Sequence, residues 1–192
     1  MPPTITATPG SATANSYETL AEAQAYFDTR LPLAGWDDAD DQNVLLIMAT
    51  RVLNAILMPS KTIVRMDGTS YYRTRRTWTG LPASATQRLA WPRTGMYDAN
   101  GNAIASTVIP QDLKDAESEL AGQLGTSDRT LDNDVVVQGL TSVRAGSVAL
   151  TFKDMIESHV LPDAVWLLMP ASWFTDEIIE PAMSALFAVV SD

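Results

Sequence analysis

Three stretches of the sequence carry apolar residues at helical spacing, and residues that start or end helices bound each one. The first follows Thr19, whose hydroxyl can accept from the third amide of a helix while Glu22 reaches back, the capping-box pattern. Its apolar positions share one helical face: Leu20, Ala23 and Phe27. The sequence therefore predicts a first helix that ends by Pro32 and Gly35.

The second and third stretches predict longer helices. Acids that favour a helix start precede one of them, and we expect it from about Asp40 to Leu57, before Pro59. The other opens at Ile109-Pro110 and stops at Gly125. The apolar stripes are Leu45, Met48, Val52 and Ile56 in the former and Leu113, Ala116, Leu120 and Leu124 in the latter. Three such helices predict a helical body, from about Asn15 to Gly125.

Residues 61–78 change to strand-forming types and interrupt this helical pattern. Asp67-Gly68 lies between two such runs and is a preferred pair for a type I′ hairpin turn. We predict a β-hairpin inserted into the helical body. Two short apolar runs within residues 133–152, Val135–Val137 and Ser147–Phe152, predict a second hairpin.

The remaining C-terminal stretch is expected to form short helices. Pro162–Met169 predicts one that Pro170 breaks, and Asp176–Val190 is a last amphipathic segment that Pro181 interrupts. The predicted fold class is therefore mainly α, a small helical bundle with an inserted hairpin and an extended C-terminal arm. We divide the chain into a flexible arm (1–14), a body (15–128) and the C-terminal arm (129–192).

Composition removes several kinds of chemistry. The chain has no cysteine, which excludes disulfides and zinc–thiolate sites. Its one histidine, His159, has no glycine-framed serine to activate, and no phosphate-binding glycine loop is present. The loop at Asp98 lacks the final glutamate of a calcium loop and predicts a plain turn. We expect no enzyme activity, no cofactor and no metal, in a soluble protein without a signal peptide.

Charge is distributed unevenly along the chain. The formal net charge is −10, but the window from Arg65 to Arg93 holds six arginines and one acid. The other residues carry 7 basic and 22 acidic groups. A general nucleic-acid binder needs a broad positive face, so this balance argues against one. It favours a surface that DNA passes without sticking.

A basic and aromatic cluster occupies the second strand of the predicted insertion: Tyr71, Tyr72, Arg73, Arg75, Arg76 and Trp78. Aromatic rings can stack on bases while arginines contact phosphates, which favours nucleic acid. However, strand residues alternate between two faces, so Arg76 is separated from Arg73 and Arg75. An acidic protein partner or a solvated hairpin fits as well. We take Arg73, Arg75, Arg76 and Trp78 as candidate interface residues.

Two further groups are candidates for an interface. Trp91-Pro92-Arg93 is either a wedge that closes the bundle or a contact through Arg93. The short pieces after Val160 carry more apolar side chains than such pieces easily bury, so they cover the body or dock on a partner. From them we take Trp166, Leu168, Trp173, Phe174 and Phe187 as candidate interface residues.

An ordered series of landmarks resembles the head–tail adaptor (connector, or head-completion) family of tailed bacteriophages. The series comprises Ala14-Asn15-Ser16-Tyr17, Trp36, Ala49-Thr50-Arg51-Val52-Leu53, Trp78-Thr79-Gly80, Gln87-Arg88-Leu89-Ala90-Trp91-Pro92-Arg93, Asp98-Ala99-Asn100-Gly101 and Ile109-Pro110. The insertion at Met58 to Arg76 departs from the family pattern.

The resemblance implies a structural virion protein, made in the host cytoplasm and located in the neck of the virion. It implies a dodecameric ring of neighbouring copies that extends the DNA channel between the portal protein and the tail. The expected partners are the portal and the next neck or tail protein, with DNA passing through without specific binding and no membrane. The alternative is a single-stranded DNA-binding accessory protein of phage replication or packaging.

Overall fold

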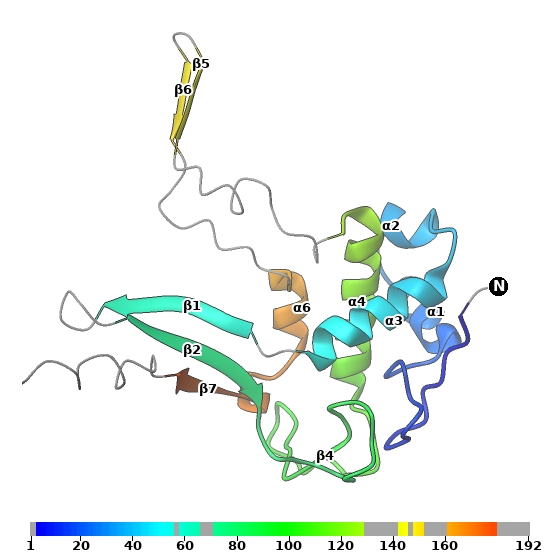
Figure 1. Cartoon of the computed structure of the whole chain (residues 1–192). Helices are drawn as coiled ribbons and strands as arrows, with labels where there is room; N and C mark the ends of the chain where they lie inside the picture. The colour runs from blue at the N-terminus through cyan, green and yellow to red at the C-terminus, as the bar shows by residue number, and fades with distance from the viewer. Residues whose placement is uncertain are drawn as a thin grey trace, which may run out of the picture.

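The computed structural model describes residues 3–55, 58–65, 71–128, 142–145, 148–151 and 161–179, with side chains for 3–55, 77–128 and 161–175. Figure 1 shows a helical body with a sheet extending from one side. Its helices are α1 (Leu20–Phe27), α2 (Ala34–Asp37), α3 (Gln42–Asn54), α4 (Gln111–Thr126), α6 (Asp163–Leu168) and the 3-10 turn η1 (Ala171–Trp173). Its strands are β1 (Met58–Arg65), β2 (Tyr71–Trp78), β3 (Leu81–Pro82), β4 (Arg93–Thr94), β5 (Ser142–Ala145), β6 (Val148–Thr151) and β7 (Phe174–Ile179). The mainly α class with hairpins is confirmed.

Helix α1 begins with the predicted capping box. The Glu22 amide donates to the Thr19 hydroxyl at 3.3 Å, and the Thr19 amide donates to the Glu22 carboxylate at 2.8 Å. The helix buries Ala23 and Phe27 and ends at Phe27, earlier than predicted. Arg30 then donates two hydrogen bonds to the Glu119 carboxylate, at 2.6 and 2.8 Å, which ties this end of the helix to α4.

Gly35 and Gly125 were predicted to end helices, and this prediction is wrong. Gly35 lies within α2 and Gly125 within the last turn of α4. A Cβ on Gly125 would lie 1.8 Å from the Gly35 carbonyl oxygen, and one on Gly35 would lie 2.2 Å from the Gly122 carbonyl oxygen. The glycines are therefore needed because the two helix backbones touch, a long-range requirement that resembles a stop signal in sequence.

Helices α3 and α4 form the centre of the body. In α4 the predicted stripe of Leu113, Ala116, Leu120 and Leu124 is buried. In α3 the fully buried face is Leu46, Ala49 and Leu53, one position away from the predicted stripe, whose members Leu45, Met48 and Val52 are only half-buried. The prediction missed this face because small residues such as Ala49 add little to an apolar pattern.

The insertion forms part of a three-stranded antiparallel sheet in the order β1-β2-β7. The turn at Asp67-Gly68 lies outside the described residues. Residues 174–179 form strand β7, so the amphipathic segment predicted to begin at Asp176 is wrong in its first residues. The physical reason is that β2 presents an open edge, and β7 covers it by pairing from Trp78↔Phe174 to Arg73↔Ile179.

The segment from Leu161 to Trp173 covers the helical body. Leu161, Val165, Met169 and Trp173 are buried in the same core cluster as Leu120 of α4. Helix α6 stops before Pro170, as predicted. The second predicted hairpin is present as β5 and β6, although its first strand is Ser142–Ala145 rather than the earlier run, which lies outside the described residues.

Candidate functional site

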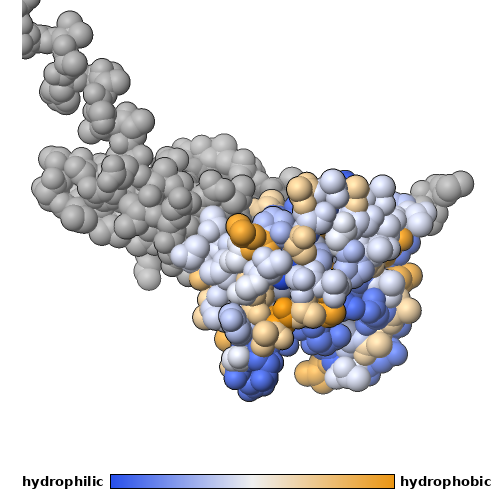
Figure 2. Space-filling view, turned by 90° about the horizontal axis from the view of Figure 1, so that it is seen from below, coloured by the Kyte–Doolittle hydropathy of each residue, from blue (hydrophilic) through white to orange (hydrophobic). Residues whose placement is uncertain are grey.

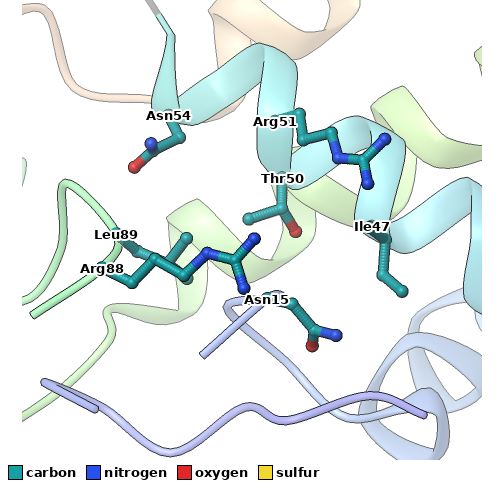
Figure 3. A pocket seen from close by; sticks show the side chains of 7 residues that line it. All are labelled: Asn15, Ile47, Thr50, Arg51, Asn54, Arg88 and Leu89. Carbon is teal, nitrogen blue, oxygen red and sulfur yellow. The ribbon is translucent and has the colours of Figure 1, made fainter. Parts of the chain in front are cut away.

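A small hollow lies where α3, the segment before α1 and the loop at residues 87–89 meet (Figure 3). We call it the α3 hollow, and its volume is about 160 Å³. The residues that line it are Asn15, Ile47, Thr50, Arg51, Asn54, Arg88 and Leu89. Two of these are cationic and none is acidic, in a chain with 23 acids and 13 bases. The lining thus differs in sign from the chain as a whole.

Both arginines of the hollow are exposed. Among the described residues, the Arg88 guanidinium has no hydrogen-bond partner, and Arg51 contacts only the Met48 sulfur, at 3.4 Å. Figure 3 shows the Arg88 side chain reaching toward Thr50 and Asn15, while the Arg51 guanidinium lies on the Ile47 side. Their charges are therefore available to a ligand rather than used within the described part of the chain.

The two asparagines are held by the fold. The Asn15 carboxamide accepts from the Thr6 amide at 2.7 Å and donates to the Thr4 carbonyl at 2.9 Å. The Asn54 carbonyl oxygen accepts from the Tyr17 hydroxyl at 3.3 Å and from the Ala90 amide. Because its oxygen is occupied, Asn54 keeps its N–H groups without a partner among the described residues.

A buried carboxylate lies behind the wall of the hollow. Glu117 of α4 is fully buried and accepts from the Ser16 hydroxyl at 2.8 Å, the Tyr17 amide at 3.0 Å and the Thr50 hydroxyl. Burial raises the pKa of Glu117 to about 7, even though these hydrogen bonds favour the charged form. Thr50 is thus shared between the hollow and the buried network.

Glu18 is a second buried acid next to this network. Its carboxylate accepts from the Ser118 hydroxyl at 2.6 Å. Burial, and then the negative charge of Glu117, raise the pKa of Glu18 to about 9. Glu18 is therefore protonated at neutral pH, so the two carboxyl groups together carry at most one negative charge there.

Arg93, a predicted interface residue, is buried and bonded to the backbone. Its guanidinium donates to the carbonyls of Thr79 at 2.7 Å, Ala90 at 3.0 Å and Gly80 at 2.9 Å. Burial lowers the pKa of Arg93. The side chain therefore clamps two loops and is not available to a partner.

The predicted aromatic candidates gather in one cluster that joins β2, β7 and the C-terminal segment. Trp173 is fully buried, and its ring centroid lies 4.8 Å from that of Trp91 with the planes tilted by 51°. Its indole N–H donates to the Tyr97 carbonyl at 2.8 Å. The ring centroid of Trp78 lies 5.7 Å from that of Trp91 and 4.8 Å from that of Phe174. Trp166, Phe174 and Leu168 are half-buried against this core. The cluster covers the helical body, which is the alternative to docking on a partner that the sequence left open for these residues.

The other predicted candidates have described backbones only, or none. Arg73, Arg75 and Arg76 lie on β2, and their side chains fall outside the described part. In the register of the sheet, Arg75 lies opposite Glu177 and Arg76 opposite Asp176, whereas Arg73 lies opposite Ile179. Phe187 and His159 lie outside the described residues.

The described surface offers neither a metal site nor a large apolar patch on the face in Figure 2. That face shows hydrophobic residues in separate spots, and single exposed apolar residues are normal for a folded chain. Among the described residues, no group of three acidic or histidine side chains is placed to hold a metal ion. None of the described helices combines the length and apolarity needed to cross a membrane.

Sequence reasoning missed Arg51, Arg88, Asn54 and Glu117 as site residues. Glu117 did leave a signal, because it is four residues after Leu113 and so lies on the apolar face of α4. An acid at such a position indicates a buried polar contact. Arg51 and Arg88 have no comparable signal, since their proximity depends on how the loop at 87–89 folds against α3.

Comparison with known proteins identifies a family for this chain. A family model described as "Putative DnaT-like ssDNA binding protein" matches residues 1–172. No curated protein and no solved structure matches the chain.

This match overturns the head–tail adaptor resemblance, because the matching family is a different one. The predictions that depended on this resemblance are therefore wrong. They are the adaptor function, the portal, ring and tail partners, and the passage of DNA without binding. The landmarks misled for a physical reason. Ala49, Leu53, Trp36 and Trp91 are all core residues, so they indicate how the body packs rather than what it binds.

Proposed function

The chain belongs to the DnaT-like single-stranded-DNA-binding protein family, and from this membership we propose that it binds single-stranded DNA without catalysing a reaction on it. The family match over residues 1–172 is the observation that carries the proposal. The fold supports it through the placement of its free cations. The lack of cysteine and the single histidine support the non-catalytic part.

The acidic net charge is compatible with this function. At physiological ionic strength, charges beyond about 8 Å are largely screened, so DNA responds to the charges near its contact. The α3 hollow presents Arg51 and Arg88 with no acid in its lining. A phosphate backbone can therefore approach this surface even though the chain as a whole is negative.

The arginines of β2 are a weaker source of contacts. Cross-strand neighbours share one face of a sheet, so the register places Arg75 with Glu177 and Arg76 with Asp176 on β7. Arg73 has an isoleucine opposite it instead. Two of the three β2 arginines are therefore paired in the sheet register with acidic residues, and Arg73 is not.

The test is fluorescence anisotropy with a labelled single strand of about 30 nucleotides, longer than the ~4–16 nucleotides that one binding module covers. We expect saturable binding that weakens with salt, with a log–log slope of about −0.7 for each phosphate engaged. A duplex of the same length should bind more weakly, and the strand should be recovered uncut. Absence of binding at low salt, or preference for the duplex, would contradict the proposal.

A further inference from the structure

We propose that the α3 hollow is a phosphate-binding subsite, in which Arg51, Arg88 and Asn54 hold one backbone phosphate of single-stranded DNA. This inference rests on the proposed function and deepens it, because it assigns the contact to a specific place in the fold. It commits to the phosphate rather than to a base as the group recognised.

The lining of the hollow favours an oxyanion. Its unoccupied polar groups are donors: the guanidinium groups of Arg51 and Arg88 and the N–H groups of Asn54. The competing acceptors are already satisfied, since the Asn54 oxygen accepts from Tyr17 and Ala90, and the Asn15 oxygen accepts from Thr6. A phosphate needs such donors and no nearby acceptor, and arginine can contact its oxygens in a bidentate way.

The size of the hollow also favours a small group. Its volume of about 160 Å³ is below the ~300–1,000 Å³ typical of sites that enclose a drug-sized ligand. A phosphate with part of its hydration fits this space, whereas a complete nucleoside would have to remain largely outside.

The donors are positioned by rigid elements and end in movable side chains. Arg51 lies on α3, and the Arg88 amide is fixed by donating to the Ser11 carbonyl at 3.2 Å. Asn54 is oriented by Tyr17, which is buried. The backbones are thus set before binding, and the two exposed guanidinium groups need only side-chain rotation to close on a phosphate.

The buried acids do not compete for this place. Thr50 lines the hollow, and its hydroxyl donates to the Glu117 carboxylate behind it. The remaining hydrogen bonds of Glu117 come from Ser16 and Tyr17 on the buried side. The carboxylate therefore faces the interior network and not the ligand.

The experiment compares Arg51→Ala, Arg88→Ala and the double variant with the wild-type chain in the anisotropy assay across salt concentrations. We expect the double change to reduce the magnitude of the log–log slope by about 0.7, because the hollow holds one phosphate, and each single change to reduce it by no more than that. Affinity should fall equally for strands of different sequence, since a phosphate contact reads no base. Arg51→Lys and Arg88→Lys should keep the slope but bind less tightly.

Lys114→Gln is the matched control. It also removes one positive charge, but Lys114 is paired with Glu22 on another part of the body. We expect this variant to keep the wild-type slope. Far-ultraviolet circular dichroism should show that every variant is folded, because the Arg51 and Arg88 side chains are exposed and their guanidinium groups have no hydrogen bond to an oxygen or nitrogen atom among the described residues.

The outcomes separate this inference from the proposed function. If the wild-type chain binds the strand and the double variant binds it with the same slope, the subsite is refuted while the function stands. Binding of inorganic phosphate is measured from shifts of the Asn54 side-chain amide resonances. If the double variant loses this binding but still binds the strand like the wild-type chain, the hollow is a site for free phosphate and the inference is also refuted. If the wild-type chain does not bind the strand, the proposed function fails first.

Discussion

Replacing Glu117 with glutamine tests the buried network directly. The carboxylate accepts from the Tyr17 amide on one oxygen and from the Ser16 and Thr50 hydroxyls on the other. A glutamine can place its carbonyl oxygen on the Tyr17 amide and its N–H groups on the two hydroxyls. Those hydroxyls can accept once each turns its single proton to a second acceptor within reach, the Glu18 carbonyl 2.6 Å from Ser16 and the Leu46 carbonyl 2.9 Å from Thr50. The network therefore survives the loss of the charge.

The expected effect depends on pH. Burial raises the pKa of Glu117 from 4.5 to about 7, so between these values the folded chain holds a proton that the unfolded chain has released. Stability therefore falls as pH rises through this window. A shift of that size corresponds to about 3 kcal/mol at pH 8, at roughly 1.4 kcal/mol for each pKa unit. Glu117→Gln removes this loss, so it should match the wild-type chain near pH 4 and exceed it by about 3 kcal/mol at pH 8.

Urea unfolding followed by tryptophan fluorescence, repeated between pH 4 and pH 8, measures this difference. Glu22→Gln provides a control of opposite sign. Burial acts to raise the pKa of Glu22, but the hydrogen bonds from Lys114 and Thr19 outweigh it and lower the pKa. Glu22→Gln should therefore be less stable than the wild-type chain above about pH 4.5. A difference between Glu117→Gln and wild type that does not change with pH would refute the reasoning.

Two further predictions concern packing. Arg93→Lys should lower the free energy of unfolding by at least about 2 kcal/mol, because one ammonium cannot replace a guanidinium that spans three carbonyls; an unchanged urea midpoint would contradict the clamp. Gly125→Ala should lower it by about 1–3 kcal/mol, because the new Cβ would lie 1.8 Å from the Gly35 carbonyl oxygen and no side-chain rotation relieves that clash. Thermal unfolding measures the effect of Gly125→Ala. A variant that is more stable than the wild-type chain would contradict the close contact between α2 and α4.

The helices could be predicted because their signals are local. The capping box at Thr19 depends on residues three apart, and the acid at the start of α3 is its cap: Asp41 accepts from the Asn43 amide at 3.0 Å. What lay far apart in sequence could not be predicted. Gly35 and Gly125 are 90 residues apart, and the second partner of β2, strand β7, begins only at Phe174. A sequence pattern shows each of these residues but does not show which distant residue it contacts in the fold.

The proposed phosphate subsite was missed because charge was counted along the chain rather than in space. The window from Arg65 to Arg93 includes Arg93, which three carbonyls hold inside the body, and it excludes Arg51, which is exposed. A net charge of −10 also includes acids that are screened from the hollow and acids such as Glu18 that are protonated at neutral pH. The attraction of a phosphate to a surface depends on how many exposed guanidinium groups lie there without an acid beside them. In the α3 hollow that number is two, and it predicts attraction where the sum over the chain predicts repulsion.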